Sequence, residues 1–424
     1  MNRSESDSME ELLKRSGYKV VGPEEQADLT IINSCTVTNQ AAAKTRSSIT
    51  SARKQSPEGK IAVIGCYAQE LGDKLLKFEN VDLALGNVNK YQIIDYIKKL
   101  EKEKNFADIK DIENIAWTNS TSTFFDEATI ADGRRTRANL KIQEGCNYFC
   151  SYCIIPYLRG APRSRDYKSC IREARELEAN NYKEIVLTGI NIGTYDHKGK
   201  RLTDLIQGLL KETELERIRI SSIEPDLIDD RLIELIENEQ RLCRHLHIPL
   251  QHGSNTILKK MNRRYSFEDY ARLVEKIENT IPGICLGSDI MTGFPGESEK
   301  AFQEMVNNLN ELPISHYHVF RYSPKEGTRA EEFLERVPSG EVKRRAKIIR
   351  NLGHKKKQDF IKQFKGKIVN VLTEKINKNN ILSGYTDNFI RVNFQGDKKK
   401  VNEILPVRIT EMKNESLKGE LVGG

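Results

Sequence analysis

The chain has 424 residues, of which 38% are apolar and 30% are charged, and its formal net charge is +7. This length exceeds one ordinary hydrophobic core and predicts two or three domains. The composition is that of a globular protein, and no apolar run approaches the roughly 18 residues that a membrane span requires. The first residues are polar and acidic without a secretory apolar stretch, so we expect a cytoplasmic protein with no membrane association.

The first block of the chain alternates apolar strands with amphipathic helices. The stretch DSMEELLKRSG predicts a helix with Ser8 as its N-cap and Gly17 at its end. The β-branched runs ADLTIINSC and KIAVIGC flank a helical stretch, which predicts a βαβ unit in an open parallel sheet. Each run ends in a cysteine, Cys35 and Cys66, and the carboxyl ends of parallel strands share one edge of a sheet. We expect both thiols at a ligand-binding edge; the alternative is that they are small buried packing residues.

Three domains are expected from the patterns that follow. Residues 1–104 form the first, and the polar, aperiodic segment 105–131 is expected to be a linker. Residues 132–361 repeat strand and helix signals, which predicts parallel strands with helical crossovers that close fully or partly into a barrel. Residues 362–424 change to short strands separated by turn residues, which predicts a small all-β barrel of the oligonucleotide-binding kind. The overall class is therefore α/β with a C-terminal β-barrel.

Positive charge is concentrated towards the C-terminus. From Glu341 to the end, 20 lysines and arginines face 9 acidic residues, a net charge of +11, whereas the rest of the chain carries −4. Such a surface favours a polyanion such as RNA, although a solvated helix face is an equal alternative. Tyr385 and Phe389 lie among cations such as Arg391, which suits base stacking, but a barrel core would also bury aromatic rings.

The stretch EGCNYFCSYC places Cys146, Cys150 and Cys153 in a C-x3-C-x2-C loop after the first strand of the large block. Disulfides are disfavoured in a reducing compartment. A structural zinc site needs four ligands, and no fourth ligand stands at a matching spacing. A 4Fe–4S cluster takes one thiolate per iron, so three cysteines leave one iron available for another ligand. The spacing therefore favours an iron–sulfur cluster that can do chemistry.

This motif, with the aromatic Tyr152 before the last cysteine, resembles that of the radical S-adenosylmethionine (SAM) enzymes. The resemblance implies a partial (β/α)6 barrel, SAM bound to the fourth iron, and reductive cleavage of SAM to a 5′-deoxyadenosyl radical. The motifs SCTVTNQAAAKTR, CIIPYLRGAPRSR, SSIEP, HIPLQHGSN and MTGFPGE, together with the terminal barrel, resemble the methylthiotransferases over essentially the whole chain. They are most similar to the branch that methylthiolates carbon 2 of N(6)-threonylcarbamoyladenosine at position 37 of tRNA. The terminal barrel resembles the TRAM domain, an RNA-binding module.

The resemblance also implies which residues contact SAM. Tyr152 would pack on its adenine, and two glycine-rich segments at strand ends would face it, represented by Gly189, Asn191, Gly287 and Gly293. Simple turn chemistry is the alternative for any single glycine. The implied partners are the tRNA anticodon loop, a reductase or flavodoxin-type electron donor, and a sulfur donor.

A second 4Fe–4S cluster is implied for the N-terminal domain. The family holds it with three cysteines, and Cys35 and Cys66 match two of them. Asn2, Glu5 and Ser6 match the residues that follow the third, so the sequence starts beyond its position. Either the start has been lost or this is a variant with two thiolates. The implied reaction uses two SAM molecules, one to methylate a sulfur species at this cluster and one to generate the radical.

The remaining cysteines and histidines receive no catalytic role. Cys170, Cys243 and Cys285 fit no ligand spacing and are expected in the core. The histidines of RHLHIPLQH and SHYHV alternate along strands, which favours core or cavity-lining positions over metal binding. Two other functions stay open: methylthiolation of a ribosomal protein side chain, which the +11 charge opposes, and a non-catalytic iron–sulfur RNA-binding protein, which the intact three-cysteine motif opposes.

Overall fold

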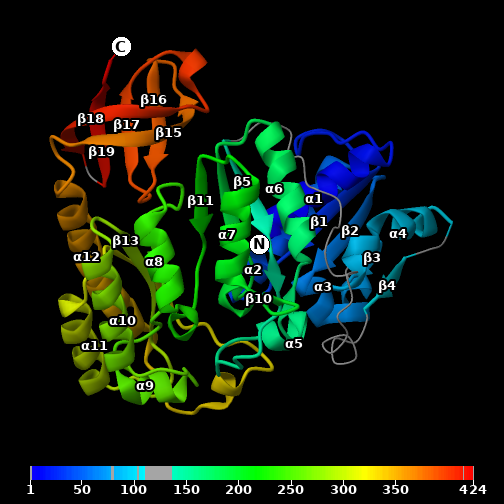
Figure 1. Ribbon diagram of the computed structural model, residues 1–424. Helices are drawn as coiled ribbons and strands as arrows, with labels where there is room; N and C mark the ends of the chain where they lie inside the picture. The colour runs from blue at the N-terminus through cyan, green and yellow to red at the C-terminus, as the bar shows by residue number, and fades with distance from the viewer. Residues whose placement is uncertain (1, 78–80, 103–104, 110–135, 414, 424) are drawn as a thin grey trace.

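The computed structural model describes residues 2–77, 81–102, 105–109, 136–413 and 415–423. Three bodies follow one another along the chain, and Figure 1 shows the N-terminal sheet and the C-terminal barrel on opposite sides of the central domain. Among the described residues, none of the helices combines the length and the apolar character needed to cross a membrane.

The N-terminal domain is an open parallel sheet in the order β1-β2-β3-β4. Its strands are β1 (Leu29–Ser34), β2 (Lys60–Gly65), β3 (Leu83–Leu85) and β4 (Phe106–Asp108), and its helices are α1 (Asn2–Arg15), α2 (Asn39–Gln55), α3 (Cys66–Leu71) and α4 (Ile93–Leu100). The expected βαβ unit is β1, α2 and β2. Strand β4 lies inside the segment that was expected to be a linker. Since β4 pairs with β3, the N-terminal sheet extends beyond residue 104, to Asp108. Residues 110–131 of that linker lie outside the described residues.

The first helix differs from the expectation. It begins at Asn2, so Ser8 lies inside it and donates a hydrogen bond from Oγ to the Ser4 carbonyl at 3.0 Å. The predicted N-cap at Ser8 is therefore wrong. The residues before Ser8 are helical as well, and the buried contacts of Glu5 described below stabilise them in that conformation. Gly17 follows the helix with φ +87°, as a helix-ending glycine does.

The central domain has six parallel strands in chain order, which confirms the partial barrel. Its strands are β5 (Arg137–Lys141), β8 (Glu184–Thr188), β11 (Arg217–Ile220), β12 (His245–His247), β13 (Cys285–Thr292) and β14 (His316–Arg321). The outer helices are α6 (Tyr167–Ala179), α7 (Leu202–Glu212), α8 (Asp230–Asn238), α10 (Phe267–Thr280), α11 (Glu299–Glu311) and α12 (Ser339–Lys362). Parallel bridges Ile218–Leu242 and Ser222–His247 join the two three-stranded halves. Shorter elements are β6 (Gln143–Glu144), α5 (Ile155–Arg159), β7 (Arg163–Ser164), β9 (Asp196–His197), β10 (Lys200–Arg201) and α9 (Asn255–Lys260).

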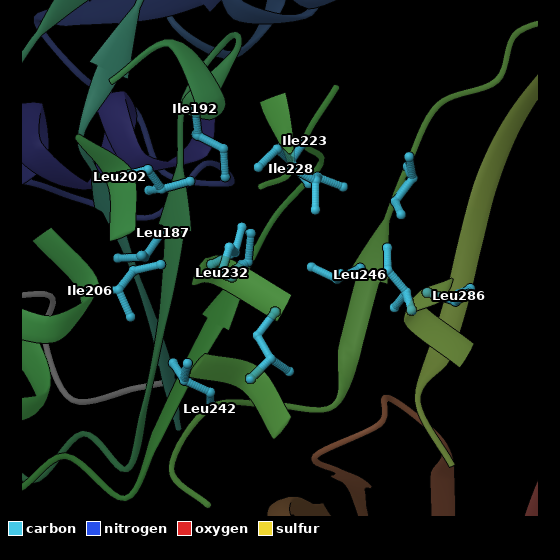
Figure 2. Close-up of a cluster of buried hydrophobic side chains, with 14 of the residues drawn as sticks. Leu187, Ile192, Leu202, Ile206, Ile223, Ile228, Leu232, Leu242, Leu246 and Leu286 are labelled. Atoms are coloured by element: carbon cyan, nitrogen blue, oxygen red, sulfur yellow. The ribbon is translucent and has the colours of Figure 1, made fainter. Parts of the chain in front are cut away.

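The core of this domain lies between the strands and the outer helices. Figure 2 shows Leu187 of β8 beside Leu202 and Ile206 of α7, and Leu246 of β12 towards Leu286 of β13. All five are at most 4% exposed, and burying a side chain of this kind contributes about 1.5–3 kcal/mol. Packing on the outer face fixes the strands, so that their inner face and their carboxyl ends remain available for chemistry.

The C-terminal domain is a closed barrel in the order β15-β16-β17-β19-β18. Its strands are β15 (Ile368–Ile376), β16 (Ile381–Thr386), β17 (Arg391–Gln395), β18 (Ile404–Lys413) and β19 (Ser416–Leu421). Arg217 and Arg219 of β11 donate hydrogen bonds to carbonyl groups of this barrel at 2.7–3.3 Å. Phe389 stacks on Tyr385 with ring centroids 4.9 Å apart and also contacts the Arg219 guanidinium. Tyr385 and Phe389 therefore take part in the contact with the central domain. The sequence had suggested base stacking for these rings.

A buried network of charges joins the N-terminal domain to the central domain. Glu5 of α1 accepts hydrogen bonds from Lys90 at 2.8 Å, and from Lys141 and Arg159 at 2.9 Å. Glu144 accepts from Lys141 and Arg159 at 2.8 Å. Burial alone would raise the pKa of Glu5, but the three cations hold that pKa well below its usual value. The network is ionised and sealed from water, so it fixes how the two domains meet.

We predict that Glu5→Gln destabilises the protein strongly. Removing one partner leaves buried cations without their counter-charge, which costs about 3–5 kcal/mol in typical proteins. The matched control is Glu10→Gln on the exposed face of the same helix, where the pair with Lys14 at 2.7 Å is worth about 0.3–0.5 kcal/mol. Urea unfolding monitored by circular dichroism measures both changes. Equal shifts of the unfolding midpoint in the two variants would contradict this view of the network.

Candidate functional site

The three-cysteine loop lies between β6 and α5 and is closed by a glycine. Gly145 has φ +75°, and a Cβ at this position would lie 2.0 Å from the Ala161 carbonyl oxygen. Only glycine therefore lets the two arms of the loop approach this closely. The Cys146 amide donates to the Gly160 carbonyl at 2.9 Å, and this bond clamps the base of the loop.

Contacts from a distant part of the chain hold the middle of the loop. Asn262, after α9, donates from Nδ2 to the Phe149 carbonyl at 3.0 Å and stabilises Phe149 in a left-handed conformation with φ +48°. Ser151 donates from Oγ to the Lys260 carbonyl at 2.8 Å. Arg263 donates from Nη1 to the Cys150 sulfur at 3.1 Å. The loop is thus held in place from both sides before any ligand binds.

The chemistry of these sulfur atoms fits a cluster. Burial raises the pKa of Cys153 to about 12 and also raises the pKa of Cys146, so thiolates here require a compensating positive charge. A bound metal supplies that charge. Among the described residues, no three cysteine sulfurs lie within 4.8 Å of one another, so the set is spaced more widely than the ligands of a single ion.

Asn191 lies beside this loop, and Gly189 belongs to the same turn after β8. The buried amide of Gln143 accepts from the Ile190 and Asn191 amides at 3.0 and 2.8 Å and fixes the turn after β8. Asn191 Nδ2 lies 4.0 Å from the Cys146 sulfur. Asn191 is 4% exposed, and its Oδ1 has no hydrogen-bond partner among the described residues, which suits a polar ligand. Gln143 was not singled out from the sequence, because its role depends on contact with the turn after the next large strand.

The other residues expected to contact SAM have packing roles. A Cβ on Gly287 would lie 2.6 Å from the His316 imidazole, and a Cβ on Gly293, where φ is +77°, would lie 2.5 Å from Val342. Tyr152 packs edge-on against Phe294 with ring centroids 6.4 Å apart. Packing alone accounts for the glycines, and contact of these three residues with SAM stays a prediction.

The two N-terminal cysteines emerge at one edge of the first sheet. Ser34 and Gly65 are register partners on β1 and β2, and Cys35 and Cys66 are the next residues. Cys66 is 2% exposed and packs against Ile154 and Leu158, which directly follow the three-cysteine loop. Both cysteines thus follow neighbouring strands at one edge of the sheet, and this edge meets the central domain at Cys66.

Polar contacts hold Cys66, and the residues that follow Cys35, against the central domain. Arg159 donates from Nε to the Cys66 sulfur at 3.3 Å. Asn87 donates to the Leu158 carbonyl at 2.8 Å. On the Cys35 side, Lys325 donates to Thr36 Oγ1 at 2.7 Å and to Glu70 at 2.6 and 2.8 Å. Arg159 and Lys325 were missed from the sequence, because only the tertiary structure brings them to the N-terminal sheet.

The other cysteines behave as expected. Cys170, Cys243 and Cys285 are 0%, 3% and 5% exposed and lie in the central domain. Burial raises the pKa of each to about 12, so they remain protonated thiols.

Three family models match the chain. The Radical SAM superfamily matches residues 140–309, the TRAM domain matches residues 362–422, and the Uncharacterized protein family UPF0004 matches residues 1–86. The three matches correspond to the central barrel, the terminal barrel and the N-terminal sheet.

Curated relatives match over nearly the whole chain. The threonylcarbamoyladenosine tRNA methylthiotransferase MtaB of Bacillus subtilis is 37% identical over 417 residues, which cover 96% of this chain and 91% of the relative. The enzyme of the same name from Aquifex aeolicus is 35% identical and is covered to 97%. The tRNA-2-methylthio-N(6)-dimethylallyladenosine synthase of Clostridium tetani is 35% identical over 437 residues, which cover 100% of this chain and 94% of the relative.

Among solved structures, the fold is similar to the radical SAM methyltransferase TsrM of Kitasatospora setae. The TM-score is 0.54 at 16% identity, and the match covers 71% of this chain and 66% of that chain. This likeness concerns the fold alone. The family models and the curated relatives, together with the cysteine loop, imply SAM and 4Fe–4S chemistry in a transferase. The chain belongs to the radical SAM tRNA methylthiotransferase family.

Proposed function

We propose that this enzyme methylthiolates carbon 2 of N(6)-threonylcarbamoyladenosine at position 37 of tRNA. The observation that carries the proposal is the contact of Cys66 with Ile154 and Leu158, which directly follow the loop of Cys146, Cys150 and Cys153. A methylthio transfer needs a sulfur-bearing site close to the site where the radical forms. The choice of branch rests on the relatives named for threonylcarbamoyladenosine, one of which is 37% identical over 96% of this chain.

We assign the cofactor ligands by position. Cys146, Cys150 and Cys153 hold the cluster that supplies the electron for SAM cleavage, and Cys35 and Cys66 hold a second cluster. Gln143 keeps Asn191 directed at the first site. Arg263 and Arg159 each donate to one sulfur and orient it. SAM contacts by Tyr152, Gly189, Asn191, Gly287 and Gly293 are part of the same proposal.

An exposed aromatic pair beside the cluster loop suits RNA. Phe149 and Tyr157 are 49% and 53% exposed, and their rings meet edge-on with centroids 5.6 Å apart. Unpaired bases of an anticodon loop stack readily on such rings. Exposed lysines of the C-terminal third, such as Lys355, Lys398 and Lys399, supply phosphate contacts without sequence preference. The proposal also includes a reductase or flavodoxin-type electron donor, a sulfur donor, and a cytoplasmic location with the tRNA substrate.

The substrate can be tested by mass spectrometry of tRNA nucleosides. The host lacks methylthiolated threonylcarbamoyladenosine and expresses the wild-type chain, the triple variant Cys146/Cys150/Cys153→Ala, or the control Cys170→Ala, which removes a buried packing thiol. We expect the modified nucleoside with the wild type and the control and none with the triple variant.

Two results would overturn this substrate. One is a methylthio group on dimethylallyladenosine in place of threonylcarbamoyladenosine. The other is no modified nucleoside although the purified protein carries both 4Fe–4S clusters and cleaves SAM, which would move the search to another substrate such as a protein side chain.

We also predict that Tyr157→Ala weakens tRNA binding. Loss of one stacked base costs about 1–3 kcal/mol, or roughly a 5- to 150-fold increase in Kd. Tyr157→Phe is the matched control, because it keeps the ring and removes only the hydroxyl. Fluorescence anisotropy with a labelled anticodon stem–loop measures Kd, and the iron content shows whether each variant keeps its clusters. Unchanged affinity for Tyr157→Ala would remove this ring from the RNA-binding face.

A further inference from the structure

Three neighbouring strands inside the central barrel each bring one metal-binding side chain to the same place. His247 on β12, Asp289 on β13 and His318 on β14 have ligand atoms that all lie within 4.8 Å of one another. His247 Nε2 lies 3.1 Å from Asp289 Oδ1, and His318 Nδ1 lies 3.7 Å from the same oxygen. Asp289 and His318 are register partners, so the backbone holds the group on one face of the sheet.

Gly287 makes room for this arrangement. A side chain there would lie 2.8 Å from His247 Nδ1 and 2.6 Å from the imidazole of His316. Strand β13, which lies between β12 and β14, therefore carries no side chain at Gly287. The ring centroids of His247 and His318 are 5.0 Å apart.

The group borders a cavity of about 600 Å³ between the central and C-terminal barrels. His247 and His318 line the cavity, with His245, His316, Arg137 and Phe389. His245 is 8% exposed, and its Nδ1 has no hydrogen-bond partner among the described residues, which suits a cavity that takes a polar ligand or water. The cavity leaves room for water or another oxygen ligand beside the three protein groups.

We propose that His247, Asp289 and His318 bind one divalent transition-metal ion of the zinc or iron(II) class, with its remaining coordination positions facing the cavity. Two imidazoles and one carboxylate are the donor set of catalytic zinc sites and of iron(II) facial triads, whereas magnesium and calcium prefer oxygen ligands alone. The site lies on the barrel strands, whereas the cysteines lie in loops that follow strands. It therefore goes beyond the two clusters of the proposed function. The sequence favoured core or cavity-lining positions for these histidines over metal binding. It did not reveal that Asp289 lies between His247 and His318.

The other explanation is that Asp289 simply accepts hydrogen bonds from the two imidazoles. The test uses the full-length protein with its clusters reconstituted, equilibrated with Zn²⁺ against a competing chelator and then freed of unbound metal. Zinc and iron are counted separately by mass spectrometry, so zinc reports this site independently of activity. X-ray absorption at the zinc edge identifies the ligand atoms and separates this site from zinc on cysteine sulfur.

We expect one zinc per chain with nitrogen and oxygen ligands only. Loss of a residue that only hydrogen-bonds to a metal ligand typically weakens metal binding by roughly 10- to 100-fold. Asp289→Asn and His318→Gln each remove a ligand and should therefore weaken zinc binding by more than that. His318 is 66% exposed, so its substitution tests the site without endangering the fold. The control is His197→Gln, because His197 also lies beside a carboxylate, Asp166 at 3.5 Å, but belongs to no three-ligand group among the described residues. Sulfur ligation, no zinc in the wild type, or unchanged affinity in both site variants would overturn the proposal.

Discussion

The enclosure of Glu5 and Glu144 by Lys90, Lys141 and Arg159 is the constraint on which the arrangement of the catalytic domains depends. Five charges removed from water are tolerated only when each finds its partners at hydrogen-bond distance, because desolvation otherwise costs several kcal/mol per ion. The contacts among them are 2.8–2.9 Å long. A displacement of one domain by a few ångströms would break the two contacts that cross between the domains, Glu5–Lys141 and Glu5–Arg159, at once. The network therefore selects one relative position of the two domains.

That position has a chemical consequence. The same Arg159 that binds both carboxylates donates to the Cys66 sulfur, so fixing the charges also places the N-terminal thiol. Lys325 performs the corresponding role for the loop of Cys35 through Thr36 and Glu70. A cation from the central domain thus contacts Cys66 directly, and another contacts the residue after Cys35. Their shared edge is held against the domain where SAM chemistry is expected.

In the C-terminal barrel, amino-acid composition indicated an RNA partner, but it did not indicate which aromatic rings are available to RNA. Its positive charge agrees with the TRAM match and with an RNA partner. The aromatic residues that composition suggested for RNA, Tyr385 and Phe389, instead contact Arg137 and Arg219 of the central domain. Two more exposed rings, Phe149 and Tyr157, lie at the cluster loop and belong to no contact between domains that the described residues show. Affinity and base stacking are therefore assigned to different parts of the molecule.

The sequence by itself determined the features that are encoded locally. Alternating apolar runs predicted the βαβ unit, the parallel strands of the central domain and the terminal barrel, because periodicity records which face of an element is buried. The spacing of Cys146, Cys150 and Cys153 indicated cluster chemistry, because their geometry is set within one loop.

Only the tertiary structure decided the features that depend on residues far apart in the chain. Glu5 and Arg159 are 154 residues apart, and Lys325 and Thr36 are 289 residues apart. No periodicity or spacing links such pairs, and the same long-range contacts explain why α1 begins before Ser8. The grouping of His247, Asp289 and His318 depends on the register of three parallel strands whose crossover helices separate them in sequence. Local patterns fix which elements form, whereas the docking of finished elements fixes which side chains meet.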